Sequence, residues 1–154
     1  MKINLLRNSN ELLNGYVNID NFVGEGKVQG DVTNLDTIVD DALADEIIAK
    51  NILQYYEYSK LVLIVQGWVK KLRHNGSITI VVPDYRAICK GIAKDIITVN
   101  NALPLLYGPQ THALLCYKSS MSLDFIKQIL TEAGLVIQKI DLDDFQICIT
   151  GLRP

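Results

Sequence analysis

The segment between residues 61 and 83 constrains the fold of this chain more than any other segment does. Its first part is periodic on one helical face, whose apolar residues are Leu61, Ile64, Val65, Trp68, Val69 and Leu72. Asn75-Gly76 supplies the left-handed residue that ends such a helix. The β-branched run over 77–82 predicts a buried strand, which Pro83 ends because proline lacks the amide that a strand ladder needs. A helix, a turn and a strand in this order indicate an α/β protein.

The rest of the chain alternates short strands with helical stretches. We expect strands over 2–6, 16–20, 27–29, 46–50, 135–140 and 145–150, and helices over 34–43, 86–103 and from Ser122 to Gly134. This alternation predicts a mainly parallel sheet, whereas the last two strands predict an antiparallel hairpin. Because no linker or repeat interrupts the 154 residues, we expect a single domain over 1–154.

Composition disfavours several classes of protein. Fifteen basic residues against seventeen acidic ones give a net charge of −2, which argues against nucleic acid as a partner. The apolar runs are too short and too often broken by charge to cross a membrane, and the first eight residues lack the apolar core of a signal peptide. Cys89, Cys116 and Cys148 have no paired spacing, which predicts buried thiols in a reducing, cytoplasmic compartment. Both histidines are far from any thiol cluster, so we expect no metal site.

Several short motifs follow one another in the order that they take in a known enzyme family. Residues 15–20 (Gly-Tyr-Val-Asn-Ile-Asp) are similar to a Gly-Trp-x-Asn-Val-Asp segment on the family's second strand, and Gly30-Asp31-Val32-Thr33 is similar to the acidic step after its third. Residues 45–55 resemble its Asp-Glu-Ile-x-Ala-x-His-Val-Leu-Glu-His run, and residues 72–84 its Leu-Lys-Pro-Gly-Gly element and Val-Pro-Asp ending. The chain thus resembles, over nearly its whole length, the class I S-adenosylmethionine-dependent methyltransferases, in particular small predicted ones of the methyltransferase type 11 group.

The resemblance implies a three-layer Rossmann-like fold, with a mostly parallel seven-stranded sheet that ends in an antiparallel hairpin. It also implies an S-adenosylmethionine site at the carboxyl ends of the parallel strands. There Asp20 would accept hydrogen bonds from both ribose hydroxyls, with Asn21 beside it. Asp31 and the Val32 amide would meet the adenine, and Asn51 would line the reacting methyl group. The alternative is that Asp20 and Asp31 are turn-forming carboxylates, which are common at strand ends.

The loop after the first strand departs from the family pattern. Where the family has a Gly-x-Gly loop that lets the backbone approach the cofactor, this chain has Leu6-Arg7-Asn8, and no glycine precedes Gly15. Asn8 tolerates the positive φ that such a turn requires, whereas Leu6 does not. Arg7 or backbone amides could still receive the cofactor's carboxylate, but Leu6 could equally plug the pocket.

Two functions therefore stay open at this stage. One is S-adenosylmethionine-dependent methyl transfer to a small-molecule or sugar acceptor, with His112 as the candidate base and Tyr85, Tyr107 and Tyr117 lining the acceptor pocket. The other is a catalytically inactive scaffold or interaction module that does not bind the cofactor and has a protein partner. In the second case we expect a homodimer interface over residues 86–106, although the same segment could form a lid.

Overall fold

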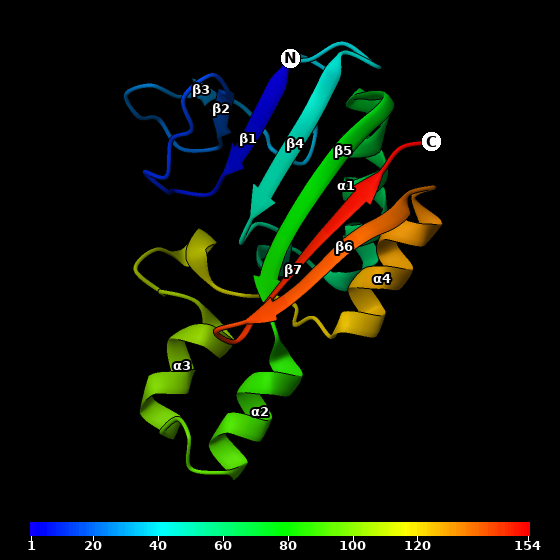
Figure 1. Ribbon diagram of the computed structural model, residues 1–154. Coiled ribbons are helices and arrows are strands. Elements are labelled where there is room, and N and C mark those ends of the chain that lie inside the picture. Colours follow the sequence, from blue (N-terminus) through cyan, green and yellow to red (C-terminus); the bar gives the residue numbers. More distant parts are fainter.

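The computed structural model describes residues 1–154 and contains one seven-stranded sheet (Figure 1). Its strands are β1 (Lys2–Leu6), β2 (Val17–Asp20), β3 (Val28–Gln29), β4 (Ala44–Lys50), β5 (Leu72–Pro83), β6 (Val136–Asp143) and β7 (Gln146–Leu152). They lie in the order β3-β2-β1-β4-β5-β7-β6. The first five pair in parallel, and β7 runs antiparallel between β5 and β6. The predicted fold class is confirmed.

Four α-helices and two 3-10 turns accompany the sheet. They are α1 (Tyr58–Lys71), α2 (Tyr85–Ala93), α3 (Val99–Tyr107), α4 (Leu123–Glu132), η1 (Leu53–Tyr55) and η2 (Ala113–Leu115). Figure 1 shows α1 and α4 together behind the sheet, while α2 and α3 extend past the carboxyl end of β5. The helix predicted before residue 72 and the helix capped by Ser122 are both confirmed. Asn75 takes the predicted left-handed conformation, with φ of 60°, but it does not end the helix as predicted, because α1 ends at Lys71 and Asn75 lies within β5.

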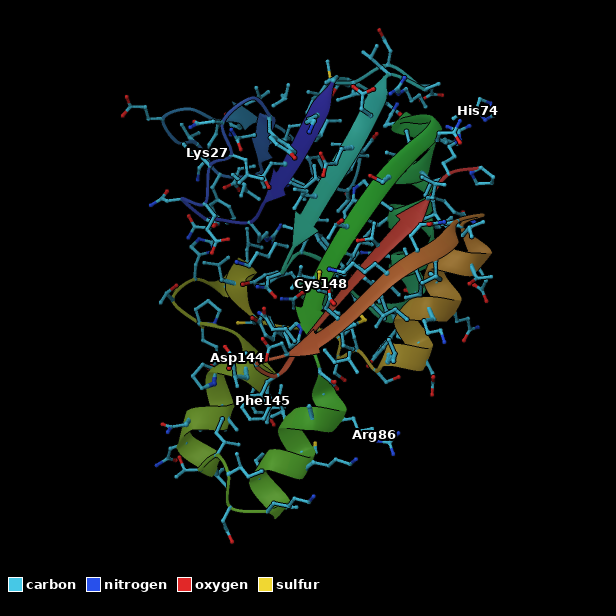
Figure 2. The ribbon with its side chains drawn as sticks, viewed as in Figure 1. Lys27, His74, Arg86, Asp144, Phe145 and Cys148 are labelled. Atoms are coloured by element: carbon cyan, nitrogen blue, oxygen red, sulfur yellow. The ribbon has the colours of Figure 1, made fainter.

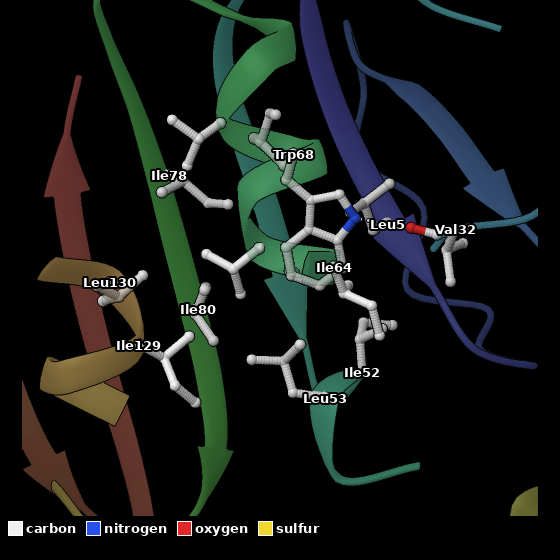
Figure 3. Close-up of a cluster of buried hydrophobic side chains, with 14 of the residues drawn as sticks. Leu5, Val32, Ile52, Leu53, Ile64, Trp68, Ile78, Ile80, Ile129 and Leu130 are labelled. Carbon is white, nitrogen blue, oxygen red and sulfur yellow. Dashed lines mark hydrogen bonds between the residues drawn. The ribbon is translucent and has the colours of Figure 1, made fainter. Parts of the chain in front are cut away.

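The core is organised around Trp68, which α1 buries against the sheet (Figure 3). Ile64 and Ile80 are buried in the same cluster. The indole Nε1–H of Trp68 donates a hydrogen bond of 2.7 Å to the carbonyl oxygen of Val32. A buried indole requires such a partner. The bond therefore ties the segment after β3 to α1 and holds that segment at the carboxyl edge of the sheet.

The prediction of a helix over 34–43 is wrong, because these residues form a series of turns. The side chain of Asn34 accepts a hydrogen bond from the amide of Asp36 (3.1 Å), and Ala42 has φ of 58°. Such local side-chain bonds compete with helix formation. Leu35 and Val39 are nevertheless buried in the core, so the apolar spacing reflects burial without a helix.

The expected helix over 86–103 is in fact the hairpin of α2 and α3. The chain breaks at Asp95, which has φ of 55°, and α3 begins after Thr98, whose hydroxyl accepts from the Asn101 amide. Pro104 lies inside α3 instead of ending it. Exposed apolar residues on the hairpin include Ile96 and Val99. A homodimer through residues 86–106 stays a prediction.

The cysteines are all free, and the prediction that they are buried is wrong, because none of them is fully buried. Cys116 and Cys148 are half-buried, and Cys148 lies on the open face of the sheet (Figure 2). Cys89 is exposed, because α2 extends beyond the sheet and buries only two of its residues. No helix is long and apolar enough to cross a membrane. No group of three or more His, Cys, Asp or Glu side chains in residues 1–154 is placed to hold a metal ion.

The hydrogen bond between Trp68 and Val32 makes a testable contribution to stability. We expect Trp68→Phe to lower the free energy of unfolding by about 1–3 kcal/mol, because the buried carbonyl of Val32 loses its donor. Urea denaturation measures this change. Leu63→Ala, on the exposed side of the same helix, is the control and should change stability by less than about 0.5 kcal/mol. Equal effects of the two substitutions would contradict this role for the indole.

Candidate cofactor site

The candidate site lies where the carboxyl ends of β1 and β2 meet. Leu6 and Asp20 are the last residues of these strands and are register partners in the parallel pair. Asn8 then takes the left-handed conformation predicted for it, with φ of 51°. This turn directs the Asn8 amide back toward β2, so the two strand ends and the loop between them share one small volume.

The loop from residue 7 to residue 16 is held by a pair of buried asparagines. Asn4 on β1 donates through Nδ2 to Oδ1 of Asn18 on β2 (2.8 Å) and to the carbonyl of Glu11 (3.0 Å). The same Oδ1 of Asn18 accepts from the Leu13 amide (3.0 Å). These bonds satisfy buried polar groups, and they anchor the loop over β1 and β2 where no helix forms.

Asp20 is completely buried and fully engaged by the chain itself. Its Oδ1 accepts hydrogen bonds from the amides of Asn8 (3.0 Å) and Phe22 (3.1 Å). Its Oδ2 forms an ion pair with Nζ of Lys27 at 2.9 Å, and the Lys27 side chain is only 5% exposed. Burial raises the pKa of Asp20, but the two amides and the Lys27 ammonium outweigh burial, so the pKa lies below its ordinary value.

Arg7 occupies an aromatic enclosure beside Asp20. Its guanidinium lies over the rings of Phe22, Tyr55 and Tyr56, at 5.7, 5.4 and 5.2 Å from their centroids. It donates to the hydroxyl of Tyr56 (2.7 Å) and to the carbonyl of Leu114 (2.9 Å), and more weakly to Oδ1 of Asn21 (3.4 Å). Burial raises the pKa of Tyr56 to about 12, so the phenol is neutral and accepts from Arg7. The cation is thus held by both stacking and hydrogen bonds.

The remaining predicted residues are spread around this centre. Asp31 is exposed and accepts from the amide (2.9 Å) and hydroxyl (2.7 Å) of Thr33, which is the turn-forming arrangement. Val32 is buried, and its carbonyl oxygen accepts the hydrogen bond from the indole of Trp68. Asn51 follows β4 with φ of 55°, and its Oδ1 accepts from Nε2 of Gln54 (3.3 Å).

His112 is exposed and caps the short turn η2, since its Nδ1 accepts from the Leu114 amide at 3.1 Å. Its ring meets Phe22 edge-on, with centroids 6.0 Å apart. The structure therefore brings Arg7, Asn8, Asp20 and Asn21 together, and it places Asp31, Asn51 and His112 around them.

Sequence reasoning missed the residues that close the site. Lys27, Tyr56 and Phe22 are the partners of Asp20 and Arg7, and none of them belongs to a recognisable motif. Leu6 is itself buried, with 3% of its surface exposed. The main cavities of the molecule lie elsewhere, and none of them is lined by Leu6, Arg7, Asp20 or Lys27.

Solved structures with the same architecture include methyltransferases. One is the 1,6-didemethyltoxoflavin-N1-methyltransferase of Burkholderia thailandensis with bound 1,6-didemethyltoxoflavin and S-adenosylhomocysteine. It is 14% identical to this chain, and the two superpose with a TM-score of 0.64 over 90% of this chain and 60% of that one. The chain therefore has the class I methyltransferase fold. A methyltransferase of Archaeoglobus fulgidus shares this fold at 13% identity, with a TM-score of 0.62 over 89% of this chain and 75% of that one.

Comparison of sequences, as opposed to structures, finds no match for this chain. No family model matches the chain, and no curated protein matches it either. The chain spans only 60% of the length of the Burkholderia enzyme.

The residues present do not fit S-adenosylmethionine in this arrangement. The oxygens of Asp20 that would accept ribose hydroxyls are occupied by two amides and an ammonium. The sulfonium of the cofactor is a cation, and the guanidinium of Arg7 already fills the aromatic enclosure that would suit one. Entry of the cofactor would therefore place a third cation beside Arg7 and Lys27.

The ion pair predicts a large cost for neutralising Asp20. We expect Asp20→Asn to lower the free energy of unfolding by about 3–5 kcal/mol, because the buried ammonium of Lys27 loses its counter-charge. The double variant Asp20→Asn, Lys27→Met should recover part of this loss. Asp31→Asn is the matched control and should cost less than about 1 kcal/mol, since Asp31 is exposed. Similar urea midpoints for the two single variants would contradict the ion pair.

The lowered pKa of Asp20 also predicts a pH dependence. An aspartate in the unfolded chain titrates near about 3.9, so folding favours the carboxylate. Its contribution to stability is therefore complete above about pH 5 and is lost as the pH falls through about 4 toward the folded pKa. We expect the stability difference between the unmodified protein and Asp20→Asn to be constant from neutral pH to about pH 5 and to shrink by about pH 3. A difference that grows toward low pH would contradict the direction of this shift.

Proposed function

We propose that this chain is a non-catalytic binding protein built on the methyltransferase fold, with its cofactor site closed by its own side chains. The buried pair between Asp20 and Lys27 is the observation that carries the proposal. Removing one partner from a buried ion pair is strongly unfavourable, so a ligand that displaces Lys27 must compensate for an unpaired charge. Its own ligand would be a small molecule or a protein partner.

Arg7 supports the same conclusion independently. Its guanidinium makes three hydrogen bonds and lies over three aromatic rings, so it is part of the folded structure. The loop Leu6-Arg7-Asn8 thus turns without glycine and fills the space over the strand ends with side chains. The Arg7 side chain and the loop Leu6-Arg7-Asn8 therefore leave no room for a cofactor to lie against the loop backbone.

The second candidate function is S-adenosylmethionine-dependent methyl transfer to a small-molecule or sugar acceptor. It is favoured by Asp20, which retains the position at the end of β2 that a ribose would need. This function requires Lys27 to leave Asp20, and Gly24 and Gly26 give its loop some freedom to move. His112 would have to give up its bond to the Leu114 amide and take the other tautomer to act as a base through Nε2, because a neutral ring whose Nδ1 accepts carries its proton on Nε2.

Isothermal titration with S-adenosylmethionine and S-adenosylhomocysteine separates the two functions. We expect no saturable heat with the unmodified protein at millimolar ligand. The double variant Lys27→Ala, Arg7→Ala should gain binding of S-adenosylhomocysteine, because it frees Asp20 and empties the aromatic enclosure. Lys50→Ala, Arg73→Ala is the matched control, since it removes the same two residue types from exposed positions and should bind nothing.

Two outcomes of this titration would contradict the proposal. Micromolar binding to the unmodified protein, abolished by Asp20→Ala, would establish the second candidate function instead. Equal behaviour of the double variant and its control would show that Lys27 and Arg7 are not what closes the site, and would leave Leu6 as the cause.

A further inference from the structure

A tyrosine-lined groove lies between the hairpin of α2 and α3 and the segment 117–120. Its volume is about 270 Å³, and Tyr58, Tyr85, Tyr107 and Tyr117 contribute four of its eight lining side chains. The first three of these tyrosines are each about half exposed. Exposed aromatic rings that share one groove form a platform for a ligand with flat, apolar faces.

The groove adjoins a small cavity that Gln54 helps to line. Tyr85, Tyr117 and Ser119 line both spaces, and the cavity of about 10 Å³ has room for one water-sized group. Gln54 is 1% exposed, and its Nε2 donates to Asn51. Its Oε1 is buried and has no donor. A buried acceptor without a donor on the wall of a cavity can take its donor from a bound water or from a ligand.

The walls of the groove are held in place before any ligand arrives. Gly108 has φ of 80°, and a β-carbon there would lie 2.8 Å from the ring of Tyr117. The amide of Tyr117 donates to the carbonyl of Tyr107 (3.0 Å), and the hydroxyl of Tyr58 donates to the carbonyl of Ser120 (2.9 Å). Pre-organised walls reduce the entropy that binding would otherwise cost.

The charge of the groove restricts the ligand further. Lys118 is its only charged lining residue, and its ammonium is paired with Glu57 at 3.0 Å. No free charge is therefore available to recognise an anion or a cation. This lining favours a neutral ligand that presents apolar faces to the tyrosines and carries a hydrogen-bond donor for Gln54.

We propose that this groove binds a neutral saccharide. The C–H faces of a pyranose ring would stack on Tyr85 and its neighbours, and one hydroxyl would donate to Oε1 of Gln54. A proline-rich segment also packs on aromatic grooves, but its prolines have no N–H to offer this oxygen. The inference rests on the proposed binding function and names the class of ligand for it.

The direct test is a titration of the full ¹⁵N-labelled chain with the methyl glycosides of glucose, galactose, mannose and N-acetylglucosamine, followed by NMR. We expect at least one glycoside to cause saturable shifts at the amides of Tyr85 and of residues 117–121. Tyr85→Ala should weaken this binding about tenfold by removing one stacking face. Leu63→Ala removes a similarly exposed apolar side chain on α1 and should leave the binding unchanged.

Gln54→Met separates ligand binding from folding. The variant removes the unpaired oxygen and keeps a long buried side chain, but it also removes the bond from Nε2 to Asn51, so we expect its melting temperature to change little. Glycoside binding should nevertheless be lost. A lower melting temperature with unchanged affinity would overturn the role given to Gln54.

Other outcomes are equally decisive. The inference is overturned if no glycoside causes saturable shifts at tens of millimolar, or if a decaproline peptide shifts the groove amides and glycosides do not. Parallel titration with S-adenosylhomocysteine keeps the two proposals apart. Binding of both ligands would contradict the closed cofactor site but support the saccharide groove, whereas binding of neither would support the closed site and contradict the groove.

Discussion

The carboxyl edge of β1 and β2 depends on one buried ion pair, between Asp20 and Lys27. The register of the two strands puts Asp20 beside Leu6, and the left-handed turn at Asn8 brings a backbone amide onto the carboxylate. The segment after β2 then places the ammonium of Lys27 beside the carboxylate of Asp20. Each partner keeps the other neutralised away from water, so the loops on both sides of β2 are held together by this contact. The carboxylate at the end of β2 is therefore paired entirely within the chain.

An aromatic contact links the surroundings of Arg7 to the groove. Tyr55 lies over Arg7 on one side and meets Tyr117 edge-on at 5.0 Å on the other. Burial raises the pKa of Tyr55 above its ordinary value, so its phenol stays neutral. Tyr55 thus stabilises the Arg7 cation in the candidate cofactor site, and it also packs against Tyr117, which lines the groove.

The sequence predicts the parts of the fold that periodicity specifies. The apolar stripe of α1, the strand after it and the final hairpin are all recognisable, and the turn at Asn8 follows from the tolerance of asparagine for positive φ. Residues 34–43 are misjudged because the side chain of Asn34 competes for the backbone. The candidate site is only half predictable. Asp20 ends a recognisable motif, whereas Lys27 lies in a loop whose sequence has no periodicity that could indicate its position.

The most direct test of the closed site is NMR observation of the Lys27 ammonium. A lysine that is 5% exposed and paired with Asp20 should give a side-chain ¹⁵N–¹H signal protected from exchange with water. We expect this signal to be present in the free protein, to be absent in Lys27→Arg, and to stay unchanged with millimolar S-adenosylhomocysteine. Saturable loss or displacement of the signal on adding that ligand would contradict the closed site, because it would show that the ligand replaces Lys27 on Asp20.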